Sequence, residues 1–202
     1  MTFTFLALFL AALKLPSVSD KVAAIRDQHK SRIVIVGVDI AQRLSGISLK
    51  LLAFERFLTD YPIWQEKVVM VQKCLLPSTR REDEDKSIKE VRYLVNRIKE
   101  KFGPFVIDCE EIAGSSLPIV ERLALWKISD VLIVTPLREG LNLLPFEYVF
   151  AKKKPASPGV VISSEFSTVC SVMNGVIRVN PFDIEVSSLQ PYYRYPTSNK
   201  FL

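Results

Sequence analysis

The chain has 202 residues, of which 49% are hydrophobic and 24% are charged, a composition typical of a globular protein with a sizeable core. Its formal net charge of +5 is modest, and the basic residues are scattered or interleaved with acids, as in RREDEDKSIKEVR at 80–92. This pattern is typical of a solvated helix and excludes the concentrated basic surface of a nucleic-acid-binding protein.

The N-terminal stretch MTFTFLALFLAALKLP is apolar over roughly the length of a signal-peptide core but is too short for a secure membrane span. Its first basic residue is Lys14, and AALK is a poor cleavage site. We prefer, in order, a segment left over from a larger protein or a misplaced start, a short buried helix, and a secretory signal. Residues 1–30 are therefore predicted to be an apolar segment and not a complete domain.

Short apolar runs then alternate with segments of helical period, which predicts strands joined by helical crossovers. The predicted strands are Arg32–Asp39, Lys67–Leu75, Pro104–Cys109, Asp130–Pro136, Gly159–Glu165 and Gly175–Pro181. The predicted helices are SLKLLAFERFLTDY, EDKSIKEVRYLVNRIKEKFG, SSLPIVERLALWKI, LLPFEYVFAKK and EFSTVCSVMN. This order predicts an α/β fold with a doubly wound parallel sheet, a Rossmann-like domain over 31–185, followed by an irregular tail over 186–202.

The first predicted helix places Leu49, Leu52, Phe54, Phe57 and Leu58 mostly on one side, a face suited to cover a sheet. Sheets of this kind bind ligands beyond the carboxyl ends of their strands. The two loops richest in glycine and polar residues follow Asp39 and Pro136. Neither GxGxxG nor GxxxxGK[ST] occurs in the sequence, so any phosphate must be held in another way.

The cysteines Cys74, Cys109 and Cys170 are odd in number, far apart in sequence and without a CxxC spacing. They favour reduced thiols in a cytoplasmic protein over a disulfide framework or a zinc site, and no metal is expected. The single histidine, His29, precedes the first strand, so a histidine acid or base is not expected at the site either.

The segment TPLREGLNLLPFEYVFAKK follows a predicted buried strand and has the features of an anion and sugar site. Gly140 allows close approach of a ligand, and we expect the amides of Leu141, Asn142 and Leu143 to open the next helix. Glu139 and Glu147 carboxylates suit hexose and ribose hydroxyls. From spacing alone, however, we interpret both as ordinary charges, Glu139 in the loop beside Arg138 and Glu147 on the helix face.

Three segments together resemble the C-terminal half of trehalose-phosphate synthase, a glycosyltransferase that joins UDP-glucose to glucose 6-phosphate. They are GVDIAQRLSGISLKLLAFERFLTDYPIWQEKVVMVQ, DVLIVTPLREGLNLLPFEYV and SSEFSTVCSVMNGVIRVNPFDIE. They occur in the family's order and spacing, and the similarity runs from Arg32 to Glu185. The resemblance implies the C-terminal domain of a GT-B enzyme, which holds the nucleotide donor, and a role in trehalose biosynthesis.

The resemblance also implies roles for individual residues. Glu139 stands where the family has an acid, usually Asp, that binds glucose hydroxyls, and its side chain is one methylene longer. Gly140, Leu141, Asn142 and Leu143 match the backbone segment that contacts donor sugar and phosphate, with Leu141 in place of the usual Met. Glu147 matches the carboxylate on the uridine ribose.

The loop after Asp39 departs from the family pattern, which is close to GVDRLDYxKG. The family's Arg and Lys, which neutralise the departing diphosphate, are replaced by Ile40 and Ser45. Because such contacts are each commonly worth a few kcal/mol, their loss predicts a severe loss of rate. Arg43 is a candidate substitute cation, although we favour a surface position for it.

Three hypotheses follow. In the first, the chain is the donor-binding half of a synthase that performs retaining glucosyl transfer without metal or cofactor, and the leaving diphosphate helps to deprotonate the acceptor. Glucose 6-phosphate then requires an N-terminal domain, and activity of this chain alone is expected to be impaired or absent. In the second, it is a non-catalytic subunit that senses sugar nucleotides or binds a synthase or a second copy of itself. The third is a gene remnant without function. No nucleic-acid or membrane partner is expected.

Overall fold

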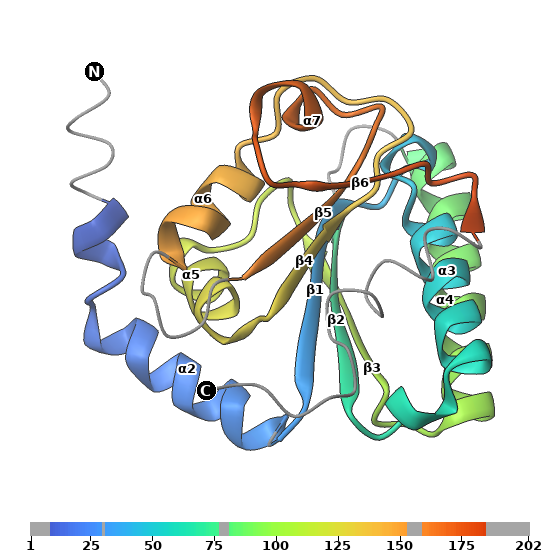
Figure 1. Cartoon of the computed structure of the whole chain (residues 1–202), viewed down its shortest axis with the longest axis horizontal. Helices are drawn as coiled ribbons and strands as arrows, with labels where there is room; N and C mark the ends of the chain where they lie inside the picture. Colours follow the sequence, from blue (N-terminus) through green and yellow to red (C-terminus); the bar gives the residue numbers. More distant parts are fainter. Residues whose placement is uncertain (1–8, 30, 77–80, 153–158, 185–202) are drawn as a thin grey trace.

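Runs of β-branched residues form one parallel sheet in the computed structural model, which describes residues 9–29, 31–76, 81–152 and 159–184 (Figure 1). The strands are β1 (Ile33–Ile40), β2 (Val68–Leu76), β3 (Ile107–Ala113), β4 (Val131–Val134), β5 (Val160–Ser164) and β6 (Ile177–Val179). The helices are α2 (Pro16–Gln28), α3 (Ile47–Asp60), α4 (Arg81–Phe102), α5 (Ile119–Ile128), α6 (Leu144–Ala151) and α7 (Val169–Val172), with short 3₁₀ turns η1 (Arg43–Ser45) and η2 (Pro62–Trp64).

The strand order is β3-β2-β1-β4-β5-β6, and every pair of neighbours is parallel. The predicted fold class, an α/β protein with a doubly wound parallel sheet, is therefore confirmed. The order reverses direction between β1 and β4, and in sheets of this type the crevice beyond the strand ends at such a switch point receives the ligand.

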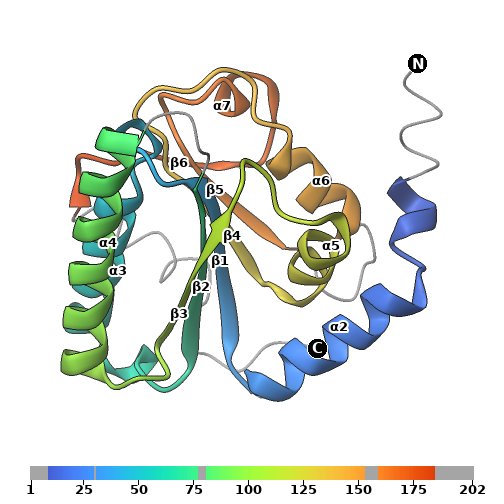
Figure 2. The same cartoon turned by 180° about the vertical axis from the view of Figure 1, so that it is seen from behind.

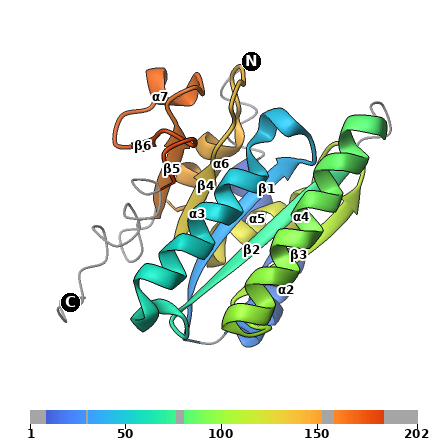
Figure 3. The same cartoon turned by 90° about the vertical axis from the view of Figure 1, so that its right-hand side faces the viewer.

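Alternation along the strands divides the core between the two faces of the sheet, as in β1, where Val34, Val36 and Val38 face one way and Ile35 the other. Helices α3 and α4 cover one face over β1 to β3, and α2, α5 and α6 lie on the opposite face (Figures 2 and 3). Burial on both faces explains why the strands read as nearly continuous apolar runs.

The described part of the N-terminal stretch packs into the core on the face of the sheet where α2, α5 and α6 lie. Phe9, Leu13 and Val18 are buried, and α2 packs against α5. The Lys127 ammonium donates a hydrogen bond to the carbonyl oxygen of Leu13 at 3.0 Å, which ties α5 to this segment. The division of the chain at residue 30 stays a prediction, and the predicted irregular tail lies outside the described residues.

Several predicted element bounds differ from the structure. Strand β3 begins at Ile107 because the preceding residues form a turn. Helix α5 begins at Ile119, since Pro118 restricts the residue before it to extended backbone. Helix α7 keeps only Val169–Val172 of its predicted span. On α3 the buried face includes Lys50 and Leu51, whereas the predicted Leu49 and Leu52 are only partly buried.

Candidate functional site

The loops after β1 and β4 meet at the switch point and border a cavity of about 350 Å³ at the carboxyl edge of the sheet. A cavity of this size falls in the range of small-molecule sites, roughly 300–1,000 Å³. Of the predicted site residues, Ile40, Ser45, Glu139, Leu141, Asn142 and Leu143 line it. The fold therefore brings together the two loops that the sequence indicated.

The loop after β1 turns sharply through η1 into α3. Its Ser45 hydroxyl donates a hydrogen bond of 2.5 Å to the carbonyl oxygen of Ile40, which closes the turn. Gly46 then adopts a left-handed φ of 69°, and a Cβ there would lie 2.0 Å from the carbonyl oxygen of Thr135. Only glycine fits this position, because both the backbone angle and the space exclude a side chain.

That close approach joins the two loops directly. The Leu137 amide donates a hydrogen bond to the Leu44 carbonyl oxygen at 2.8 Å, and Thr135 Oγ1 lies 3.5 Å from the Gly46 carbonyl oxygen. The two loops that border the cavity are therefore held together through their backbones.

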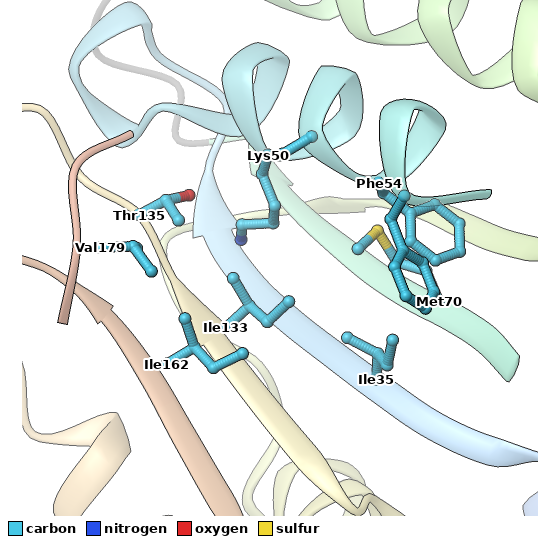
Figure 4. Close-up of a pocket in the computed structure, with 10 residues that line it drawn as sticks. Ile35, Lys50, Phe54, Met70, Ile133, Thr135, Ile162 and Val179 are labelled. Carbon is cyan, nitrogen blue, oxygen red and sulfur yellow. The ribbon is translucent and has the colours of Figure 1, made fainter. Parts of the chain in front are cut away.

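A buried charged network surrounds Asp39, a cavity residue in β1. Lys50 extends from α3 to the sheet, as Figure 4 shows, where its ammonium donates to Asp39 Oδ2 at 2.5 Å and to Gln72 Oε1 at 3.3 Å. Gln72 Nε2 donates to the same carboxylate oxygen at 2.9 Å. Because the Lys50 and Asp39 side chains are only 2% and 6% exposed, the carboxylate at the end of β1 is fixed and its charge compensated.

Glu139 is the central acid of the loop after β4. Its carboxylate accepts hydrogen bonds from Asn142 Nδ2 at 3.1 Å and from the Ser167 hydroxyl at 3.4 Å, and its backbone forms an isolated bridge with Ser167. Burial raises the pKa of Glu139 above its ordinary value, against the opposing effect of the Asn142 hydrogen bond. The group is therefore a positioned acceptor beside the cavity.

The start of α6 lies later than predicted. The helix begins at Leu144, and its first amide donates to Asn142 Oδ1 at 2.9 Å, so the amides of Leu141 and Asn142 precede the helix. Asn142 thus holds Glu139 with its amide nitrogen and the helix with its oxygen. Gly140 is exposed, with no atom within 4 Å of the place its Cβ would occupy, so a ligand can approach the backbone there.

The Glu147 carboxylate accepts hydrogen bonds from other side chains of the protein. Its carboxylate accepts a bidentate pair from Arg122, with Nε at 2.7 Å from Oε2 and Nη2 at 3.2 Å from Oε1. Trp126 Nε1 lies 3.4 Å from Oε2. Arg122 lines the cavity, whereas Glu147 is not among the residues that line it, so the arginine is the member of this pair that borders the open space.

Arg43 points elsewhere. It is exposed and borders a separate groove of about 210 Å³ between η1, α4 and Phe182. The structure thus places the candidate substitute cation on the surface beside the site, the position that the sequence favoured for it.

Sequence reasoning missed Lys50, Gln72 and Arg122 as site residues. Gln72 was visible as a polar residue inside the apolar run KVVMVQKCL, and Lys50 as a cation on the apolar side of its helix. Arg122 carries no such signal, because arginine on a helix is ordinarily a surface residue.

Other candidate groups do not reach the cavity. His29 lies near the opposite edge of the sheet, where Nε2 is 3.8 Å from Asp108 Oδ2 and burial lowers its pKa. All the cysteines are free, although Cys74 and Cys109 Sγ atoms are 3.8 Å apart on adjacent strands. Within the described ranges we find no cluster of at least three metal-ligating side chains, and no helix there has the length and hydrophobicity to cross a membrane.

Comparison with known proteins decides the family. The family model described as glycosyltransferase family 20 matches residues 6–189. The chain belongs to glycosyltransferase family 20. The resemblance to trehalose-phosphate synthases is thereby confirmed, and the match includes the N-terminal helix α2 as well as the sheet.

Among curated relatives of this family-20 chain, the UDP-forming α,α-trehalose-phosphate synthase of Yarrowia lipolytica is 36% identical over 178 residues. A probable synthase of Arabidopsis thaliana is 37% identical over 192 residues. The alignments cover 88% and 89% of this chain but only 37% and 23% of those proteins, so the chain spans a minor part of their length.

Solved structures agree on the fold. A Burkholderia xenovorans UDP-forming synthase in complex with glucose 6-phosphate has a TM-score of 0.80 and 27% identity, over 89% of this chain and 40% of that one. The N-terminal domain of the Candida albicans trehalose-6-phosphate phosphatase has a TM-score of 0.78 and 28% identity, over 88% and 37%. An E. coli protein solved with UDP-2-fluoro glucose has a TM-score of 0.84 at 23% identity, over 96% and 42%, and supports the fold alone.

Proposed function

We propose that this chain is the donor-binding half of a trehalose-phosphate synthase and holds UDP-glucose at the switch point between β1 and β4. The observation that carries the proposal is the Glu139 cluster, in which a half-buried carboxylate is fixed by Asn142 and Ser167 next to exposed backbone at Gly140. Carboxylate and amide groups of this kind are suited to hexose hydroxyls.

Within this proposal the sugar contacts Glu139, the backbone from Gly140 to Leu143 approaches sugar and phosphate, and Glu147 accepts from the ribose. Glu147 retains capacity for that bond, since Oε1 accepts only one of the hydrogen bonds described above. The chemistry is retaining transfer to glucose 6-phosphate, in which the leaving diphosphate takes the acceptor proton, and neither a metal nor a protein nucleophile takes part.

The acceptor half of the reaction has to come from outside the sheet domain. Large apolar side chains are exposed along the carboxyl edge, namely Leu141, Leu143, Phe166 and Phe182. This edge is the surface on which we place the acceptor-binding part. With Ile40 and Ser45 in place of the cationic pair, we expect this chain alone to transfer glucose slowly or not at all.

Calorimetric titration with UDP-glucose tests the proposal. Wild type should bind saturably, and Glu139→Ala should weaken binding by about tenfold or more, because a hydrogen bond to a charged group contributes roughly 1.5–3 kcal/mol. Glu147→Ala should also weaken it. Glu100→Ala, an exposed acid on α4, is the matched control and should bind like wild type. A folded wild type that binds no UDP-glucose would refute the donor-site proposal.

A second candidate is a non-catalytic module that binds a sugar nucleotide or a complete synthase. Two observations favour it: the loss of the cations at 40 and 45, and the similarity to a domain of a protein named for a phosphatase. It predicts ligand binding without UDP release from UDP-glucose and glucose 6-phosphate. Light scattering should then show a complex with a synthase, or a homo-oligomer, heavier than the 22.9 kDa monomer. We place either form in the cytoplasm, in keeping with free thiols.

A further inference from the structure

The cavity is lined by more acidic than basic side chains among the described residues. Among the described residues that line it, Asp39 and Glu139 are acids and Arg122 is the one basic side chain. Lys50 does not line the cavity and its ammonium is already bonded to Asp39, and Arg43 borders the neighbouring groove. A negatively charged ligand in this cavity therefore has Arg122 as its nearest available cation among these residues.

Arg122 has more N–H donors than its partners within the protein use. A guanidinium carries five N–H groups in a fixed planar fork. Here Nε and one Nη2 hydrogen are directed at Glu147, and one Nη1 hydrogen is directed at the Leu117 carbonyl oxygen at 3.0 Å. One hydrogen on each terminal nitrogen is not used by these partners, and guanidinium N–H groups are strong donors to phosphate oxygens.

The guanidinium is also held in place before any ligand arrives. Glu147 fixes one side of the plane, the Leu117 carbonyl oxygen fixes the other end, and the Arg122 side chain is 18% exposed. Such preorganisation lowers the entropy lost on binding. Ser115 and Ser116 line the same cavity, and their hydroxyls can donate to further phosphate oxygens.

We propose that Arg122, positioned by Glu147, binds the diphosphate of the ligand and replaces the cationic pair lost at Ile40 and Ser45. The inference rests on the proposed function for the choice of a nucleoside diphosphate as ligand. Glu147 is then a positioning residue for Arg122, in addition to any contact it makes with the ribose. The anion site is moved from the β1 loop to the first turns of α5, across the cavity.

The test is calorimetry with UDP, inorganic pyrophosphate and uridine as probes. Arg122→Gln should weaken UDP and pyrophosphate binding by about tenfold or more, the effect of one charged hydrogen bond, and should change uridine binding much less. Arg122→Lys should recover part of the loss. The control is Arg92→Gln on α4, which breaks a bidentate pair with Glu111 between two residues that do not line the cavity, and it should change none of these affinities.

Because Arg122→Gln leaves Glu147 partly buried and unpaired, the double variant Arg122→Gln/Glu147→Gln provides a second measurement in a chain without that charge. It should lose pyrophosphate binding to the same extent. Unchanged pyrophosphate affinity in both variants, or equal losses for uridine and UDP, would overturn the role of Arg122. Failure of wild type to bind UDP-glucose, with Arg122-dependent pyrophosphate binding intact, would instead refute the proposed donor and keep the anion site.

Discussion

Removing the Lys50 ammonium with Lys50→Met should destabilise the fold strongly and distort the candidate site. The Lys50 to Asp39 pair is 2.5 Å long, and both side chains are nearly fully buried. Breaking a buried pair by removing one partner costs about 3–5 kcal/mol, since the remaining charge is left uncompensated. A loss of that size is a large part of the roughly 5–15 kcal/mol that stabilises a domain.

Urea unfolding monitored by circular dichroism measures this loss. With a slope of about 2 kcal/mol per molar urea, the midpoint should fall by roughly 1.5–2.5 M. Arg56→Met is the matched control on the same helix, because Arg56 pairs with Asp60 at the surface and such pairs contribute less than about 0.5 kcal/mol. The double variant Lys50→Met/Asp39→Asn should regain much of the lost stability. If Lys50→Met costs no more than Arg56→Met, the reasoning about this network is wrong.

Two further predictions concern the loops. Gly46→Ala should lower the unfolding free energy by several kcal/mol, since the new methyl group would clash with the Thr135 carbonyl oxygen. Gly103→Ala is the control, because Gly103 has a φ of 98° with open space around it, and it should cost only about 1 kcal/mol. Equal costs for the two variants would show that the contact between the loops does not contribute to stability. Glu139→Gln should raise the unfolding free energy near pH 7 and leave it unchanged below about pH 4. Burial raises the pKa of Glu139 in the folded state above its unfolded value of about 4.3. The stability linked to protonation of Glu139 is therefore fully present below the unfolded pKa and is lost as pH rises through the folded pKa. Thermal unfolding at both pH values checks this, and a difference independent of pH would contradict it.

The sheet was predicted well because strands and helices are indicated by patterns within short stretches of sequence. Runs such as RIVIVGVD are apolar on both faces, as buried parallel strands require, and the helical segments between them leave few topologies. The β3 bounds were less well predicted, because β3 lies at the edge of the sheet and carries Asp108, Glu110 and Glu111 among its apolar residues. An edge strand of mixed polarity gives only a weak pattern.

The candidate site was only partly predicted, because some of its contacts join residues that are distant in the sequence. Motif residues such as Glu139 and Asn142 are only three positions apart in the chain, so their proximity could be read directly. Arg122 and Glu147 are 25 positions apart and lie on different helices, so nothing in the sequence indicates that they pair. The buried pairing of Lys50 with Asp39 likewise depends on how α3 crosses the sheet, which tertiary packing decides.

The hydrogen bond between Leu137 and Leu44, together with the contact of Gly46 on Thr135, makes the loops after β1 and β4 a single mechanical unit. A ligand that displaces one loop must displace the other, so the side of the cavity formed by Ser45 and the side formed by Glu139 move together. Replacing the loop after β1 with one that carries cations would accordingly require the loop after β4 to be replaced with it. A lysine introduced singly at position 45 would have to leave the buried place of a serine that closes the turn.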